Sequence, residues 1–147
     1  MNKNVFIALL HYPVYNKDGE VITTTVTNYD LHDISRAART YGIKKYYVVN
    51  QLKSQQSLVK RMRDYWTSGF GADYNGTRHE AFKVMEIKDT LEDTIKDIKK
   101  DTGQKPVLVT TSAQKSKETI SFQDLREDMH SSNQPYLIIF GTGWGLT

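Results

Sequence analysis

The chain has 147 residues, of which 38% are hydrophobic and 25% are charged, and it carries a net charge of +3 with a pI near 9.0. This length suits one domain with a single core, and the composition is typical of a globular chain rather than a disordered one. No apolar run approaches the ~20 residues of a membrane-spanning helix, and the lack of cysteine excludes disulfides, thiolate nucleophiles and cysteine-ligated zinc. The mild positive charge permits a polyanionic partner without demanding one.

The first part of the chain predicts a buried strand followed by a loop. Val5 to Leu10 is a short, continuous apolar run, which is typical of a strand buried on both faces. Because the run is short and lacks a small-residue cleavage site, we interpret it as a strand rather than a signal peptide and expect a cytoplasmic protein. A turn-rich loop from His11 to Glu20 leads into a short strand or extended segment over Val21 to Val26.

A helix and a second strand follow this segment. Asn28 or Asp30 is predicted to cap a helix over Leu31 to Tyr41. Gly42 closes that helix, because glycine suits the position that ends one, and Lys45 to Val49 forms the next strand.

The segment from Ser54 to Thr67 shows helical spacing. Its apolar positions share one face, which consists of Leu58, Met62, Tyr65 and Trp66. A polar loop covers Gly69 to Thr77, and Glu80 to Phe82 is expected to form a short helical turn. Val84 to Ile87 is the third predicted strand.

The last third of the chain repeats the alternation of helix and strand. Thr90 and Asp93 stand three positions apart, as in a capping box, and open a helix that Gly103 ends. Pro106 to Thr110 forms the fourth strand, and the turn Thr111-Ser112-Ala113 follows it.

Ser121 is predicted to cap a further helix, whose inward positions are Phe122, Leu125 and Met129. After Pro135, the fifth strand runs from Tyr136 to Phe140 into a glycine-rich turn, Gly141 to Gly145. Strands separated by helices imply right-handed crossovers. The sequence therefore predicts one α/β domain over residues 1–147, with a mainly parallel sheet and helices on both faces.

In such a sheet the loops at the carboxyl ends of the strands gather at one edge. These loops begin at His11, Asn50, Thr111 and Gly141. The loops at Thr111 and Gly141 are the most ligand-like, because both offer backbone donors beside small side chains. Neither has the lysine of a phosphate-binding P-loop, and the glycines follow the last strand instead of the first. Both facts argue against ATP and NAD.

The helix that starts near Leu31 carries a polar cluster. His32 and Asp33 stand four and three positions before Arg36, spacings that bring side chains together on a helix. Two interpretations stay open: a solvated face with an ion pair, or an arginine pair, Arg36 and Arg39, aimed at phosphate or at a developing negative charge. The histidines are widely spaced and form no zinc motif, so no metal site is predicted; they are His11, His32, His79 and His130.

Four segments together resemble a small bacterial branch of the SPOUT-class RNA methyltransferases. They are residues 11–16 (His-Tyr-Pro-Val-Tyr-Asn), 27–34, 36–42 and 140–146. The resemblance covers essentially the whole chain. It implies that S-adenosylmethionine binds in a deep trefoil knot at the carboxyl ends of parallel strands, in loops of the C-terminal half. It also implies an active site at a homodimer interface.

The resemblance assigns candidate roles to individual residues. It implies cofactor binding by Thr111, Ser112, Ala113, Phe140, Gly141, Thr142, Gly143, Trp144, Gly145 and Leu146. In the first motif of the class, an arginine stands six residues after an asparagine. Here Arg36 matches the arginine, Asp30 occupies the place of the asparagine, and Asn28 lies two positions earlier. The catalytic candidates are therefore Arg36, Asn28 and Asp33.

Members of this class continue past the glycine turn with a loop and a long helix, which thread the knot and contribute to the dimer. The sequence as it stands has neither. We therefore expect a chain truncated at its C-terminus, with an incomplete knot if the protein ends at Thr147.

Three functions stay open at this point. The first is S-adenosylmethionine-dependent methylation of a tRNA or rRNA nucleotide. The second is a non-catalytic remnant that binds RNA or the cofactor, for which the relevant contacts would be lysines 44, 45, 99, 100, 115 and 117. The third, least favoured because no phosphate loop is present, is a small α/β enzyme that uses a nucleotide. Trp144, a large ring between two glycines, would be a lid over a ligand or a plug at a subunit interface.

Overall fold

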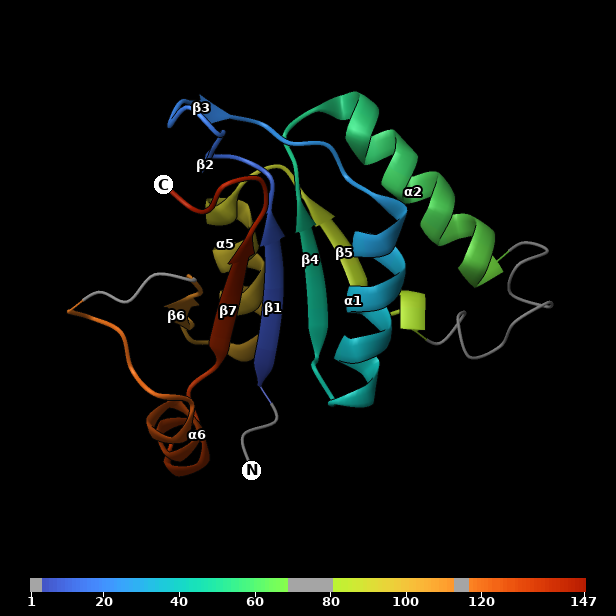
Figure 1. Ribbon diagram of the computed structural model, residues 1–147. Coiled ribbons are helices and arrows are strands. Elements are labelled where there is room, and N and C mark those ends of the chain that lie inside the picture. The colour runs from blue at the N-terminus through green and yellow to red at the C-terminus, as the bar shows by residue number, and fades with distance from the viewer. Residues whose placement is uncertain (1–3, 69–80, 113–116) are drawn as a thin grey trace.

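The structure is a computed structural model that describes residues 4–68, 81–112 and 117–147, with the exception of the Asn28 side chain. Its centre is a five-stranded sheet in the order β5-β4-β1-β7-β6, in which all neighbours are parallel (Figure 1). The strands are β1 (Val5–Leu10), β4 (Lys45–Val49), β5 (Met85–Lys88), β6 (Val107–Thr110) and β7 (Tyr136–Gly141). The predicted α/β class with a parallel sheet is confirmed.

The order of the strands places a reversal point at the middle of the sheet. From β1 the chain moves outward through β4 to β5, and it returns on the other side through β6 to β7. β1 and β7 are therefore neighbours, with Leu10 opposite Gly141 at their carboxyl ends. Open α/β sheets bind ligands beside such a reversal, at the carboxyl edge.

Helices lie on both faces of the sheet (Figure 1). They are α1 (Asn28–Thr40), α2 (Lys53–Ser68), α5 (Leu91–Thr102) and α6 (Phe122–Ser131). On one face, Leu31 of α1 and Val59 of α2 pack with Ile7 and Leu9. On the other face, Ile98 of α5 packs with alternate residues of the same strands, and this second core consists of Phe6, Ala8, Leu10, Tyr47, Val49, Leu137 and Ile139. Burial on both faces explains why the strands read as continuous apolar runs.

Side-chain caps fix where the helices begin. The cap of α1 is Thr27, not Asn28 or Asp30 as the sequence predicted: its hydroxyl accepts from the Asp30 N–H, and the Asp30 carboxylate accepts from the Thr27 N–H. Asp30 is thus the third residue of a capping box. Thr90 caps α5 as predicted, and Gly103 ends it with a φ of 80°.

Two predictions about the apolar faces of helices hold only in part. In α6, Leu125 and Met129 are half-buried, but Phe122 is 95% exposed.

In α2, Met62 and Trp66 pack against the core, whereas Leu58 and Tyr65 are exposed. The buried residues of this helix are Val59 and the polar Gln56. Spacing tells which positions share a face, but the packing of the helix on the sheet decides which face is covered.

Two short strands lie beyond the carboxyl end of β1. β2 (Val14–Tyr15) falls in the segment expected to be a loop, and it pairs antiparallel with β3 (Val21–Ile22). Only the first two residues of the segment predicted over residues 21–26 are strand. Across the described ranges, no helix is long and apolar enough to span a membrane.

Candidate functional site

The loops that follow the parallel strands meet at one edge of the sheet, as predicted. His11, Asn50, Thr111 and Thr142 follow β1, β4, β6 and β7. Because β1 and β7 are neighbours and β6 pairs with β7, the loops after these three strands are adjacent. The candidate cofactor residues of both loops therefore belong to one region.

The glycine turn, Gly141 to Gly145, and Leu146 after it lie against strand β2 near the top of Figure 1. The Trp144 N–H donates to the Tyr15 carbonyl oxygen at 2.8 Å, and the Tyr15 N–H donates to the Gly145 carbonyl oxygen at 2.9 Å. Gly143 has a φ of 61°, and a Cβ at this position would lie 2.9 Å from the Tyr15 oxygen. Glycine is therefore required at position 143 both for its backbone conformation and for its contact with β2.

Threonine hydroxyls hold the turn to the end of β1. The Thr142 hydroxyl donates to the Leu10 carbonyl oxygen at 3.2 Å and shares a short hydrogen bond with the Thr24 hydroxyl. Thr24 is itself fixed, because its N–H donates to the His11 carbonyl oxygen at 2.9 Å. The loop after β1 and the glycine turn thus form one hydrogen-bonded unit.

The other predicted cofactor loop begins beside this unit. The backbone N–H and the hydroxyl of Thr111 both donate to the Ile139 carbonyl oxygen, at 3.1 and 3.0 Å. These bonds place Thr111 next to the end of β7, where Phe140 and Gly141 follow. Ser112 is exposed, and Ala113 lies outside the described residues.

Aromatic rings are exposed around the glycine turn. Phe140 is 39% exposed and Trp144 is 68% exposed, and Tyr12 and Tyr15 on the facing loop are also exposed. Such rings offer flat apolar faces to a ligand base or to a second protein surface.

The catalytic candidates on α1 do not form the cluster that their spacing predicted. Asp33 and Arg36 are exposed, and within the described part of the chain their side chains form no ion pair. His32 is not on the polar face: its ring packs edge-on against Phe82 and Trp66, with centroids 5.0 and 5.8 Å away. Asn28 begins α1.

Sequence reasoning missed a pair at the same edge, formed by a buried histidine and a partly exposed aspartate. His11 is fully buried, its Nδ1 lies 3.0 Å from the Val49 carbonyl oxygen, and its Nε2 lies 3.9 Å from Oδ2 of Asp30. Burial lowers the pKa of His11, and the Val49 hydrogen bond and the Asp30 charge oppose this effect only in part. A histidine directly after a buried strand is the signal that could have marked this residue.

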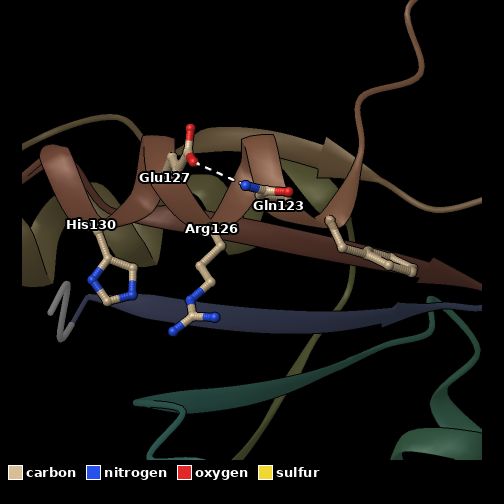
Figure 2. A pocket seen from close by; sticks show the side chains of 5 residues that line it. Gln123, Arg126, Glu127 and His130 are labelled. Carbon is tan, nitrogen blue, oxygen red and sulfur yellow. Dashed lines mark hydrogen bonds between the residues drawn. The ribbon is translucent and has the colours of Figure 1, made fainter.

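A separate hollow lies on α6. This helix is at the opposite end of the sheet from the glycine turn (Figure 1). The residues that line the hollow all come from α6. Figure 2 shows that the side chains of Arg126 and His130 leave this helix on the same side. The Gln123 amide donates to Glu127 at 3.4 Å. Among the residues that the structure describes, no cluster of three or more histidine or carboxylate side chains could hold a metal ion.

The sequence matches known proteins over nearly its full length. A family model described as SAM-dependent RNA methyltransferase matches residues 4–147. A protein of Aquifex aeolicus that is named only as uncharacterized is 43% identical over 146 residues, which are 99% of this chain and 71% of that protein.

Two further relatives carry the name tRNA (guanine-N(1)-)-methyltransferase. The protein of Oleidesulfovibrio alaskensis is 35% identical and that of Nitratidesulfovibrio vulgaris is 38% identical, each over 144 residues. The match covers 98% of this chain but 33% of each relative. The family match confirms the predicted resemblance to RNA methyltransferases, and with it the predicted reaction, RNA methylation, and the predicted cofactor, S-adenosylmethionine. This chain belongs to the S-adenosylmethionine-dependent RNA methyltransferase family.

Proposed function

We propose that the glycine turn and the loop Thr111 to Ala113 form the S-adenosylmethionine site of this chain. The observation that carries the proposal is the anchoring of the turn at the carboxyl edge: backbone hydrogen bonds join it to Tyr15, and Thr111 is bonded beside it. This edge borders the strand reversal between β1 and β7, where open α/β sheets bind small molecules.

The groups present fit the chemistry of S-adenosylmethionine. Phe140 and Trp144 expose rings on which adenine can stack. Gly143 and Gly145 have φ angles of 61° and 111° and no Cβ, so the backbone there can approach a ligand closely. When bound, the cofactor supplies a methyl group on a positively charged sulfur. The contribution of the chain is to hold that methyl group in line with the accepting atom.

We propose a tRNA as the substrate, with guanine as the first nucleotide to test. The two relatives named for this activity align over 98% of this chain, which supports the choice. Arg36 and Asp33 are exposed on α1, where they are candidates, together with Asn28, for contacts with RNA or for catalysis. A guanidinium fork suits phosphate oxygens. A methylated rRNA would be the alternative result of the same assay.

We further propose that residues 1–147 belong to one SPOUT-like domain, which acts in the cytoplasm as a homodimer and binds the cofactor in a trefoil knot. The exposed Trp144 ring supports a dimer, because apolar rings of this size are commonly covered by a partner. Sedimentation equilibrium tests this part. Trp144→Ser is expected to weaken the dimer if a second copy covers the ring, whereas Tyr65→Ser, a change at an exposed ring on α2, is expected to leave it unchanged.

The cofactor site is tested by calorimetric titration of S-adenosylmethionine and S-adenosylhomocysteine. Micromolar binding is expected for the wild-type chain. Gly143→Ala is expected to abolish or strongly weaken it, because the new Cβ would lie 2.9 Å from the Tyr15 oxygen at a positive φ. The matched control is Gly103→Ala at the end of α5, which has the same sign of φ but no atom within 4 Å. Its binding should equal that of the wild type.

Methyl transfer is then measured with tritiated cofactor and an unmodified tRNA transcript. Transfer to tRNA supports the proposed function. Cofactor binding without transfer to tRNA or rRNA would instead favour a binding protein. Loss of binding in both glycine variants alike would show that strain at a positive φ disturbs the whole fold, so that the loss does not depend on the contact with β2, and it would contradict the proposed role of the turn.

A further inference from the structure

Asp30 lies at the carboxyl edge of the sheet. Part of its side chain contacts the protein, and part is accessible to solvent. Its side chain is 25% exposed, and its Oδ2 accepts a hydrogen bond from the Thr27 N–H at 3.1 Å. The same oxygen lies 3.9 Å from Nε2 of His11, which is too long for a hydrogen bond. Behind the carboxylate, the Tyr46 hydroxyl donates to the Asp30 carbonyl oxygen at 3.1 Å and fixes the first turn of α1.

His11 links this carboxylate to the candidate cofactor loop. Its carbonyl oxygen accepts from the Thr24 N–H, and the Thr24 hydroxyl is bonded to that of Thr142 in the glycine turn. The residue before it, Leu10, accepts the second hydrogen bond of Thr142. One short segment of the chain thus contacts both the Asp30 carboxylate and the glycine turn.

The hydrogen-bond partners of His11 determine where its proton lies. The Val49 carbonyl oxygen, 3.0 Å from Nδ1, can only accept, so a neutral ring carries its proton on Nδ1. Nε2 then directs a lone pair at the Asp30 carboxylate, which also only accepts. Nε2 has no hydrogen-bond partner among the described residues. Two acceptors therefore face each other, and one additional proton placed between them would satisfy both.

The surroundings keep that additional proton away at neutral pH. Burial lowers the pKa of His11, and Asp30 is the charged side chain that acts against this effect. Tyr46 on β4, whose hydroxyl donates to the Asp30 carbonyl oxygen, has its pKa raised by burial, so it stays neutral. Nε2 of His11 and the Asp30 carboxylate therefore hold no proton between them and can accept one together. The Asp30 carboxylate is the group of the two that solvent can reach.

We propose that Asp30 accepts the proton that the substrate nucleotide loses on methylation, and that His11 is the positioning residue that completes this acceptor. The inference rests on the methyltransferase function proposed above. When a ring N–H or an O–H is methylated, its bond to hydrogen breaks and a bond to the methyl carbon forms. The electron pair of the carbon–sulfur bond stays on sulfur, which becomes neutral. The proton passes to the Asp30 carboxylate and is shared with Nε2 of His11, so atoms and charge balance.

The state of the pair can be read without any activity measurement. Nitrogen-15 NMR of the imidazole at neutral pH is expected to show the Nδ1–H form of His11 in the wild-type chain. On titration, Asp30→Asn should lower the pKa of His11 further, because the opposing negative charge is gone. The matched control is Asp93→Asn, since Asp93 has the corresponding position in α5 and its N–H likewise bonds the capping threonine at 3.1 Å. An Nε2–H form, or a titration that Asp30→Asn leaves unchanged, overturns the proposal.

The catalytic role is tested by single-turnover methyl transfer. Asp30→Asn should slow transfer by about 100-fold or more, the usual contribution of a general base, with cofactor affinity unchanged. Asp30→Glu should restore part of the rate, and Asp93→Asn should keep all of it. A parallel loss of cofactor affinity and rate in Asp30→Asn would show a structural cap and overturn the role. Absence of transfer by the wild type would overturn the proposed function itself, whereas the NMR form of His11 would still show whether the pair exists.

Discussion

The Tyr47 hydroxyl donates a hydrogen bond of 2.6 Å to Oδ2 of Asp97, across the interface between β4 and α5. Lys45 lies 3.2 Å from the same oxygen, and Lys88 lies 3.6 Å from the other. Burial alone would raise the pKa of Asp97, but the hydrogen bonds from Tyr47 and Lys45 outweigh it and hold that pKa below its usual value. The carboxylate thus fixes α5 to the centre of the sheet.

Removing the Asp97 carboxylate should lower the free energy of unfolding more than removing an exposed carboxylate does. Asp97→Ala leaves the Tyr47 hydroxyl and Lys45 without their partner, and we expect a loss of roughly 1–3 kcal/mol in the free energy of unfolding. The control on the same helix is Asp101→Ala, which breaks an ion pair of 3.4 Å between two more exposed side chains, Lys44 and Asp101. Its cost should be about 0–1 kcal/mol. Urea unfolding measures both, and equal losses would contradict the role given to Asp97.

The burial of His11 predicts a pH dependence of stability. Its pKa in the folded chain lies below the ordinary value of 6.5, so the unfolded chain binds the proton first as the pH falls. Stability due to neutral His11 should therefore be complete above pH 6.5 and fall below it, by at most about 1.4 kcal/mol per pH unit, until the folded pKa is reached.

Urea unfolding at a series of pH values measures this slope. His11→Asn, whose amide can still donate to the Val49 carbonyl oxygen, should remove the contribution of His11. His130→Asn, a change at an exposed position on α6, should leave that contribution in place. The prediction fails if the slopes of the two variants are the same.

The Thr24 hydroxyl should matter more for the cofactor than for the fold. Thr24→Val removes its bond to Thr142 and should cost about 0.5–1.5 kcal/mol in unfolding free energy. Because the same bond fixes the glycine turn, cofactor affinity should fall in calorimetry, and Thr24→Ser should restore it. The neighbouring Thr23→Val, which loses only a 3.5 Å contact with Gln51, should change neither quantity. Unaltered affinity in Thr24→Val would argue against a cofactor role for the turn.

The exposure of Phe122 predicts tolerance to substitution. Because the ring is 95% exposed, Phe122→Ser should change the unfolding free energy by no more than about 0.5 kcal/mol. Phe82→Ala, a change at a ring with 0% exposure, should cost about 3–5 kcal/mol. Thermal unfolding of the two variants provides the comparison. A large loss in Phe122→Ser would show that the ring is covered in solution.

Local signals explain what could be predicted from the sequence. Continuous apolar runs identified β1 and β7, and Thr90 and Gly103 marked the ends of α5, because these features depend on residues close in sequence. Burial that depends on partners far along the chain escaped prediction. Gln56 is buried because its amide donates to the Asn50 carbonyl oxygen at 2.7 Å, a contact that no hydrophobic pattern encodes.

The candidate site likewise has features that the sequence predicted and features that it did not. The glycines and Thr111 drew attention by composition and by their place after strands, and the parallel sheet brings them to one edge. The pairing of His11 with Asp30 was not predictable, because it requires β1, the two short strands and α1 to be assembled first. Strand β2 was likewise not predicted, because it lies within a segment whose residues are typical of a loop.

The bond between Thr142 and Leu10 joins residues that are 132 positions apart. Contacts of such long range form late in folding, because the intervening chain must first be ordered. A partly folded chain in which β1 and β7 are not yet paired therefore has no glycine turn in place and should not retain the methyl donor. Cofactor binding would then report that the sheet has folded around β1 and β7, and it would favour the folded state over partly folded ones.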